Sequence, residues 1–215
     1  MDRAELKARA RAQLGGGIFQ NLWMMGLAVC LLIGLMESAA AGILPGIGAL
    51  IVVGPLEYGM AFIFLKQARD HQPVQLGDMF RGFQDDFGGT FLIGLMTSLF
   101  TFLWSLLFVI PGIVKSFSYA LTPYILGDCK NVRAQDALKL SMRMMKGHKG
   151  ELFVLCLSFL GWLLLSALTA GLLEIFYVGP YMNNTFAGYY AERKAAALAE
   201  GVVTEAELSG ETPIA

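Results

Sequence analysis

Residues 89–126 read GTFLIGLMTSLFTFLWSLLFVIPGIVKSFSYALTPYIL, a run of 38 residues in which Lys115 is the only charge. An apolar helix of roughly 20 residues crosses the hydrocarbon core of a bilayer, which is about 30 Å thick. As one straight helix this run would be about 57 Å long, so we expect it to fold back on itself. The pair Pro111-Gly112 favours a turn. The sequence therefore predicts a span at 89–110 and a returning span at 113–127.

The composition of the whole chain agrees with a membrane protein. Of its 215 residues, 56% are hydrophobic and only 15% are charged, whereas a soluble domain is about a quarter charged. The net charge of −1 gives no basic excess, which argues against a nucleic-acid-binding protein. The three cysteines, Cys30, Cys129 and Cys156, have no paired spacing, so we predict neither a disulfide framework nor a metal site.

The other apolar runs predict four more spans, giving an all-α membrane protein with six transmembrane helices. The predicted spans cover residues 18–36, 43–65, 89–110, 113–127, 151–171 and 172–190. They form one membrane domain over residues 1–194, followed by a polar tail at 195–215. We expect the tail to begin as a helical continuation and to fray by Ser209-Gly210.

A signal peptide is an alternative interpretation of the first span. A basic head precedes this span and Ala39-Ala40-Ala41 follows it, a pattern that imitates a cleavage site. The head also carries Asp2 and Glu5, and the repeat described next requires the span. We therefore favour an uncleaved first helix.

Prolines and glycines indicate an internal repeat of three helical hairpins. LPGI at 44–47 matches IPGI at 110–113, an offset of 66 residues. Pro55, Pro123 and Pro180 fall within the second, fourth and sixth spans. Each proline removes a backbone hydrogen bond, which predicts a kink in every even-numbered helix.

Basic residues predict the orientation, because cytoplasmic loops are enriched in Lys and Arg. The N-terminal head, the connectors 66–87 and 127–150 and the polar segment 191–215 together hold 15 of the 16 Lys and Arg residues. We therefore predict that both termini are cytoplasmic. The basic connectors are also candidate binding sites for anionic lipid headgroups.

The connector at 131–145 contains the most amphipathic segment of the chain. Its apolar face recurs at helical spacing and comprises Ala134, Ala137, Leu138, Met142 and Met145. Such a helix beside membrane spans can lie in the headgroup layer with this face toward lipid. The alternative is a cytosolic helix packed on the inner ends of the spans.

Two charges lie deeper inside the predicted spans than the others, Glu57 and Lys115. Ionisable residues within a membrane are costly and often functional. One hypothesis is that the two form an intramembrane ion pair. The alternatives are that Lys115 extends toward the outer interface, or that both residues belong to a transport path.

No enzyme motif stands out elsewhere. The chain lacks a Gly-rich phosphate loop, a Gly-x-Ser-x-Gly elbow and a His-Glu-x-x-His zinc helix. His148 has no nearby cysteine or second histidine, which favours a solvated loop residue over a metal ligand. We therefore expect no catalytic residue, no cofactor and no metal.

Three segments resemble a known family. MMKGHKGELF at 144–153, LSFLGW at 157–162 and TFAGYY at 185–190 are similar to sequences of the domain-of-unknown-function 975 family of small bacterial integral-membrane proteins. The resemblance extends from the head to about Lys194. It implies a bacterial plasma-membrane location and supplies no activity.

Two functions remain open from the sequence. The first is a non-enzymatic scaffold or partner-binding protein whose partner is unknown. The second is a small-solute or lipid transporter with a polar path among the kinked helices. The two would be distinguished by whether Glu57, Lys115, Asn183 and Asn184 line one continuous cavity.

Overall fold

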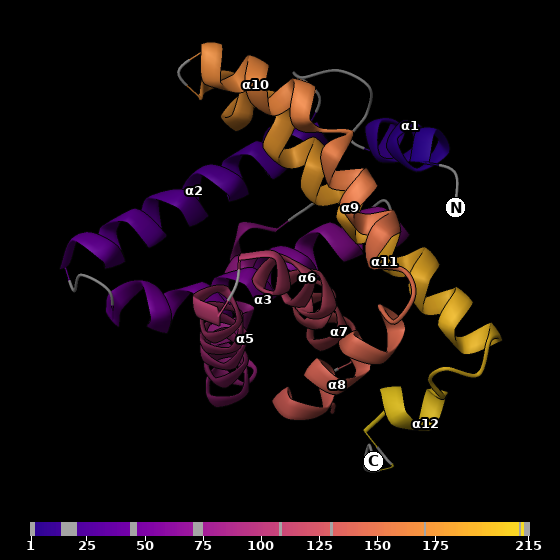
Figure 1. The fold of residues 1–215 in the computed structure, drawn as a ribbon. Helices are drawn as coiled ribbons and strands as arrows, with labels where there is room; N and C mark the ends of the chain where they lie inside the picture. Colours follow the sequence, from indigo (N-terminus) through magenta and orange to yellow (C-terminus); the bar gives the residue numbers. More distant parts are fainter. Residues whose placement is uncertain are drawn as a thin grey trace.

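Helices make up nearly all of the computed structural model of the protein (Figure 1). The structure describes residues 3–13, 21–43, 47–70, 75–107, 109–129, 131–169, 171–210 and 212. No strand occurs within these residues. The predicted all-α class is therefore confirmed.

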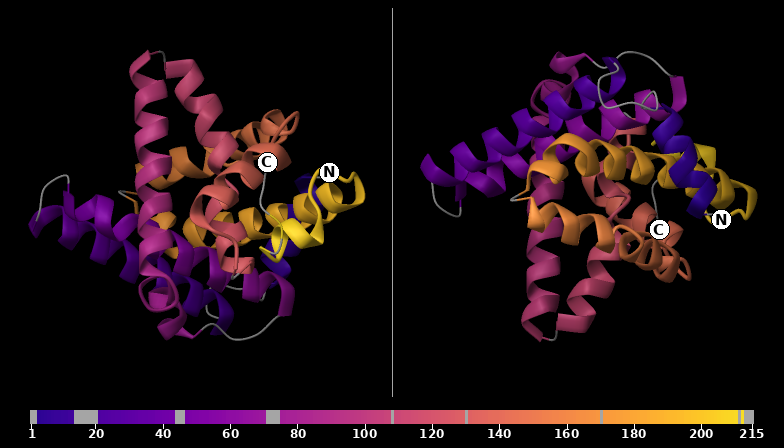
Figure 2. Two further views of the ribbon diagram at one scale, coloured as in Figure 1. Left: turned by 90° about the horizontal axis from the view of Figure 1, so that it is seen from below. Right: turned by 90° about the horizontal axis from the view of Figure 1, so that it is seen from above.

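The helices follow one another with short connections. In chain order they are α1 (Arg3–Gln13), α2 (Asn21–Ile43), α3 (Ile47–Asp70), the 3₁₀ turn η1 (Leu76–Phe80), α4 (Arg81–Gln84), α5 (Phe87–Leu107), α6 (Val109–Tyr119), α7 (Thr122–Asp128), α8 (Ala134–Met144), α9 (Lys149–Leu157), α10 (Leu160–Leu168), the π-helical segment η2 (Glu174–Val178), α11 (Gly179–Ala199) and α12 (Glu205–Leu208). Figure 2 shows α5 and α6 side by side, with their connected ends projecting away from the other helices.

Helix α3 lies at the centre and contacts α2, α5, α7 and α11. Its crossing with α5 is close because glycines face each other there. A Cβ atom built on Gly54 would lie 2.3 Å from the backbone oxygen of Thr90, and one built on Gly94 would lie 2.6 Å from the Cα of Gly54. Small residues allow such close approach of helix backbones, a common arrangement in membrane proteins.

The six predicted spans are not recovered as six long apolar helices. By length and composition, one helical stretch of the described residues, Lys149–Leu168, could cross a membrane. A second qualifies if Leu76–Gln84 and Phe87–Leu103, which meet at 88°, are counted as one bent span. Within α2, the residues with described side chains include a shorter apolar stretch, Met24–Ala39. The structure thus confirms a helical chain without confirming the six-span arrangement.

The predicted turn at Pro111-Gly112 is misplaced by a few residues. Both residues lie in the first turn of α6, which begins at Val109. A proline is tolerated there because its missing N–H would have no helical partner in the first turn. Helix α5 ends at Leu107, so the two helices meet before the proline rather than at it.

The three predicted proline kinks take two forms. Pro55 lies inside the continuous helix α3. Pro123 instead lies in the first turn of α7, which begins at Thr122, so the predicted fourth span is broken at Ala120-Leu121. Pro180 lies in the first turn of α11, directly after the π-helical segment η2, and π segments are a recognised cause of helix distortion.

One face of α8 was predicted to contact lipid. In the structure this face is packed inside the protein. Ala134, Ala137, Leu138 and Met145 are buried, and Met142 is half-buried. Helix α8 contacts α5, α6, α7 and α11. The lipid-facing interpretation is therefore wrong, and the alternative of a helix packed on its neighbours fits. The amphipathic pattern identified the buried face correctly but could not distinguish protein from lipid.

The tail was predicted to fray by Ser209-Gly210, but in the structure it is folded there. After Gly201, which has a φ of +68°, the chain turns back and forms α12. The Thr204 hydroxyl accepts a hydrogen bond from the Glu207 N–H while the Glu207 carboxylate accepts one from the Thr204 N–H, a capping box. Val203 and Leu208 are buried, which adds apolar packing.

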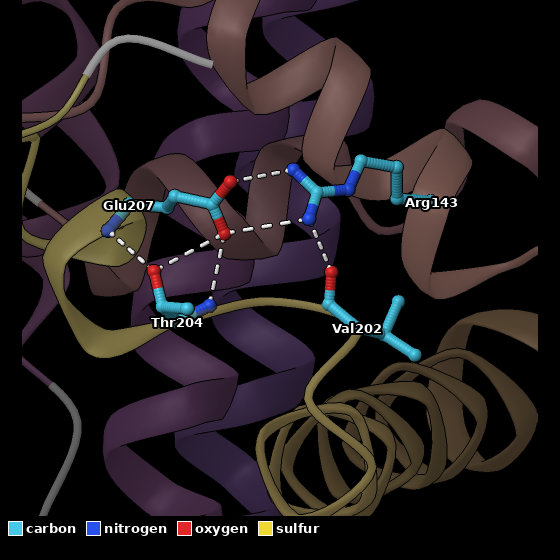
Figure 3. A network of polar contacts seen from close by, with 4 residues as sticks. All are labelled: Arg143, Val202, Thr204 and Glu207. Atoms are coloured by element: carbon cyan, nitrogen blue, oxygen red, sulfur yellow. Dashed lines mark hydrogen bonds and ion pairs between the residues drawn. The ribbon is translucent and has the colours of Figure 1, made fainter. Parts of the chain in front are cut away.

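Arg143 of α8 attaches this segment to the body of the protein (Figure 3). Its guanidinium donates to both carboxylate oxygens of Glu207, at 2.6 and 3.5 Å, and to the backbone oxygen of Val202. The Glu207 carboxyl has a lowered pKa, chiefly because of the hydrogen bond from Arg143. The tail is therefore held in its fold by Arg143, which lies 64 residues before Glu207 in the sequence.

Candidate functional site

The main candidate site is a cavity of about 380 Å³ between α3, α5, α6, α7, α9 and α11. Its walls are mainly apolar and aromatic, with a few hydroxyl groups and one carboxylate. They comprise Glu57, Met60, Ala61, Ile93, Thr97, Thr101, Ser116, Phe117, Tyr119, Ala120, Leu121, Pro123, Tyr124, Leu152, Cys156, Phe186 and Tyr189. The predicted intramembrane residue Glu57 is thus part of a cavity.

Interrupted helices position this lining. Pro55 and the close crossing at Gly54 lie less than one turn before Glu57 in α3. On the opposite wall the chain leaves α6 after Tyr119 and begins α7 at Thr122. The wall residues 119–121, together with Pro123 and Tyr124, surround this break. The break therefore supplies part of the space that a continuous helix would fill with packed side chains.

Two polar side chains of the wall lack partners within the structure. The Thr97 hydroxyl is buried and has no hydrogen-bond partner among the described residues. The Glu57 carboxylate likewise makes no hydrogen bond or ion pair with any residue of the described ranges. A buried polar group without a partner is costly. A ligand that supplies a donor or a positive charge would remove this cost.

Aromatic packing holds the wall in place around these groups. Tyr124 stacks on Tyr190 of α11 with ring centroids 5.7 Å apart. Phe117 of α6 makes an edge-to-face contact with Phe153 of α9 at 6.0 Å. Such pairs stabilise their arrangement beyond the burial of apolar area alone. The cavity therefore has walls fixed by contacts outside it.

The other predicted polar residues lie elsewhere. Lys115 lines a separate pocket with Lys146 and Lys149. The Asn184 amide donates to the backbone oxygen of Ala10, 2.9 Å away, and the Asn183 amide to that of Gly179, 3.0 Å away. Glu57, Lys115, Asn183 and Asn184 therefore do not share one continuous cavity among the pockets of the described residues.

Helix α1 occupies the region around Asn184. Besides the contact at Ala10, its Lys7 ammonium donates to the backbone oxygen of Ser158, 3.0 Å away, and lies 3.8 Å from the ring centre of Phe159. Ser158 and Phe159 form the break between α9 and α10, where backbone oxygens lose helical partners. The basic head is thus docked on the helices rather than detached from them.

A buried carboxylate that sequence reasoning missed lies next to the cavity. Asp128, at the end of α7, has a side chain only 7% exposed. It accepts hydrogen bonds from Arg69 of α3, from Lys194 of α11 at 2.6 Å and from the Tyr190 hydroxyl at 3.0 Å. Burial raises the pKa of Asp128, but the hydrogen bonds from Arg69 and Lys194 lower it by more, so the pKa lies below its ordinary value. The cluster joins the ends of three helices.

The chemistry of the two sites differs. The charges around Asp128 are already paired with one another, which is typical of a structural cluster. The cavity instead combines one carboxylate with the aromatic side chains Phe117, Tyr119, Tyr124, Phe186 and Tyr189. Aromatic faces and a carboxylate both attract organic cations. Among the described residues, no group of three or more His, Cys, Asp or Glu side chains is arranged to hold a metal ion.

Comparison with known protein families gives a match to part of the chain. Residues 106–197 match the family described as Protein of unknown function (DUF975). The match confirms the predicted family over this segment, and the predicted extent back to the N-terminal head is not covered by it. The matched segment includes α6, α7, α9 and most of α11, hence one side of the cavity, while Glu57 lies outside it. No curated protein and no solved structure matches the chain.

Proposed function

We propose that this chain is a polytopic membrane protein that binds a small amphipathic ligand in the Glu57 cavity. Its matched family has no known activity. We further propose that the role is non-enzymatic, in the bacterial plasma membrane. The observation that carries the binding function is the Glu57 carboxylate, which has no partner among the described residues and lies in an aromatic cavity of about 380 Å³.

Membrane embedding is supported by the apolar surface of the helices. Large hydrophobic side chains are exposed along α2, α5, α6, α9 and α10. The most exposed include Leu168 at 83%, Leu35 at 64%, Phe102 at 63% and Leu164 at 62%. Soluble monomers rarely expose contiguous apolar surface on this scale, whereas lipid covers it without cost.

A common cytoplasmic side for several helix ends is supported by the Asp128 cluster. Arg69, Asp128 and Lys194 come from the ends of α3, α7 and α11, each of which was predicted to face the cytoplasm. Their ion pairs bring these three ends together. We therefore retain the proposal of cytoplasmic termini.

Binding is favoured over transport along a continuous path. The residues expected to form such a path are divided among separate sites, so the cavity supports a pocket more directly than a channel. A transporter remains the second candidate, because the cavity wall includes the break between α6 and α7, and interrupted helices occur at transporter binding sites. A scaffold that binds a protein partner is compatible with a ligand-filled cavity.

The Glu57→Gln variant tests the binding proposal. We expect benzyltrimethylammonium, an aromatic quaternary cation, to bind the wild-type protein in nanodiscs and to bind the variant about tenfold more weakly. Two opposite unit charges about 4 Å apart attract each other by about 4 kcal/mol at an effective dielectric constant of about 20. Desolvation offsets part of this attraction, and about 1.4 kcal/mol corresponds to a factor of ten. Isothermal titration calorimetry measures both affinities.

Two controls accompany this experiment. Glu205→Gln removes an exposed carboxylate from α12 that does not line the cavity, and it should leave the affinity for the cation unchanged. Neopentylbenzene, the uncharged analogue, should bind the wild type and Glu57→Gln equally. Equal affinity of the cation for wild type and Glu57→Gln would refute the role of Glu57. Cation uptake into proteoliposomes would distinguish a transporter from a binding protein.

A further inference from the structure

A second pocket of about 380 Å³ opens between α6, the turn after α8 and the beginning of α9. Its lining comprises Lys115, Ser118, Met142, Lys146, Gly147, Lys149 and Gly150. This basic pocket shares no residue with the Glu57 cavity. A ligand of this pocket would not depend on binding in the Glu57 cavity, but it rests on the membrane placement proposed above.

Three lysines from three different elements converge on the basic pocket. Lys115 comes from α6, Lys146 from the turn after α8, and Lys149 is the first residue of α9. No carboxylate is part of the lining. Like charges brought together in one pocket repel each other, so an anion placed among them would be strongly attracted.

Glu151 follows the last residue of the pocket lining in the sequence, but its carboxylate does not line the basic pocket. Glu151 lies 3.1 Å from the Nδ1 atom of His148 and borders a different pocket, beside Arg3. The positive φ of +85° at Gly147 reverses the chain so that α9 begins at the rim of the basic pocket. The first turn of a helix has unpaired N–H groups and a positive dipole end, which adds to the attraction of an anion.

Apolar surface flanks the basic pocket on both sides. Ile113 and Val114 of α6 are 47% and 44% exposed, and Phe153 and Leu157 of α9 are 48% and 51% exposed. The two helices contact each other through Phe117 and Phe153. A ligand with a charged head and apolar chains could therefore place its head among the lysines and its chains along α6 and α9.

We propose that the basic pocket binds the phosphate headgroup of an anionic membrane lipid, with its acyl chains against the exposed faces of α6 and α9. Basic pockets between membrane helices are suited to such headgroups. The phosphate chemistry alone would also suit a soluble phosphate. The exposed apolar side chains beside the pocket favour a lipid, because acyl chains can pack against them and inorganic phosphate cannot.

The position of Lys115 in the basic pocket differs from both positions expected from the sequence. From the sequence, Lys115 was expected to pair with Glu57 or to extend toward the outer interface. The structure instead groups it with Lys146 and Lys149, which belong to the most basic predicted cytoplasmic connector. The lipid is therefore assigned to the cytoplasmic leaflet.

The test compares two double variants by native mass spectrometry of protein released from nanodiscs. The nanodiscs contain equal amounts of phosphatidylglycerol and phosphatidylcholine. We expect the wild type to retain phosphatidylglycerol about tenfold more often, since each lysine near an anionic lipid contributes appreciably to binding. Lys115→Gln/Lys149→Gln should lose this preference. Arg133→Gln/Lys139→Gln, which removes the same charge from exposed positions of the same connector, should keep it.

Two further measurements keep the proposal falsifiable. Thermal melts and the single variants Lys115→Gln and Lys149→Gln show whether the pocket variant is folded, and each folded single variant should lose part of the preference. An undiminished preference in the folded pocket variants would overturn the proposal. An alternative outcome is that inorganic phosphate stabilises the lipid-depleted protein while phosphatidylglycerol is not preferentially retained. That result would overturn the lipid assignment in favour of a soluble phosphate.

Discussion

The Gly54→Leu variant is expected to fail to form the native arrangement of α3 and α5. A Cβ at position 54 would lie 2.3 Å from the Thr90 backbone oxygen and 3.0 Å from the Cα of Gly94. Both contacts are with backbone atoms, which cannot move aside as the end of a side chain can. Thr90 is fixed further because its hydroxyl donates to the Gly82 backbone oxygen at 2.8 Å. Overpacking of a tight core costs about 1–3 kcal/mol or more, and we expect a loss at or above the upper end.

A glycine in open space provides the matched control. A Cβ built on Gly34 of α2 would have no neighbouring atom within 4 Å, so Gly34→Leu should not clash. Leucine also favours a helix over glycine by roughly 0.5–1 kcal/mol. Thermal melts in detergent and size-exclusion chromatography compare the two variants. Equal melting temperatures for Gly54→Leu and Gly34→Leu would contradict the close crossing of α3 and α5.

The Asp128→Asn variant is expected to lower the free energy of unfolding by about 3 kcal/mol at neutral pH. The change leaves Arg69 and Lys194 without their shared counter-charge. Breaking a buried ion pair costs about 3–5 kcal/mol, and we take the lower end because the Arg69 side chain is 42% exposed. Asp136→Asn is the control, since its partner Arg133 is 77% exposed and a surface ion pair contributes about 0–1 kcal/mol.

The effect of Asp128→Asn should depend on pH in a defined direction. The pKa of Asp128 is lowered in the folded protein, so its contribution is present above the unfolded value of about 3.9. That contribution is lost as the pH falls through the folded-state pKa. The stability difference between wild type and variant should therefore be constant from about pH 7 to 5 and shrink below about pH 4. A difference that grows on acidification would contradict the ion cluster.

The helical class was predictable because apolar runs and prolines are local signals. The positions of the helix breaks were not. Pro111-Gly112 is typical of a turn, yet the first turn of a helix accepts a proline, so α6 begins before this pair, at Val109. The tail was expected to fray because its composition is polar. Its folding depends on Arg143, which no pattern within residues 195–215 reveals.

The candidate site was predictable only in part. Glu57 stood out because a charge in an apolar run is rare. Its neighbours Tyr124 and Tyr189 resembled ordinary packing residues, and only the fold shows that they line the same cavity. Asp128 was missed because its partners Arg69, Tyr190 and Lys194 are 59 or more residues away. One signal existed, since Asp128 is an isolated carboxylate at the start of the most basic connector.

The measurement that tests the membrane placement most directly is the environment of spin labels at Leu164 and Phe102. Both side chains are exposed, at 62% and 63%, and both are assigned to lipid. Labels are attached to single cysteines in a background without Cys30, Cys129 and Cys156, with a label at the exposed Arg133 as the reference for water. In nanodiscs, oxygen should relax the labels at 164 and 102 strongly and a water-soluble nickel complex only weakly, with the reverse at 133. If the nickel complex reached the labels at 164 and 102 as readily as the label at 133, the proposed membrane placement would be contradicted.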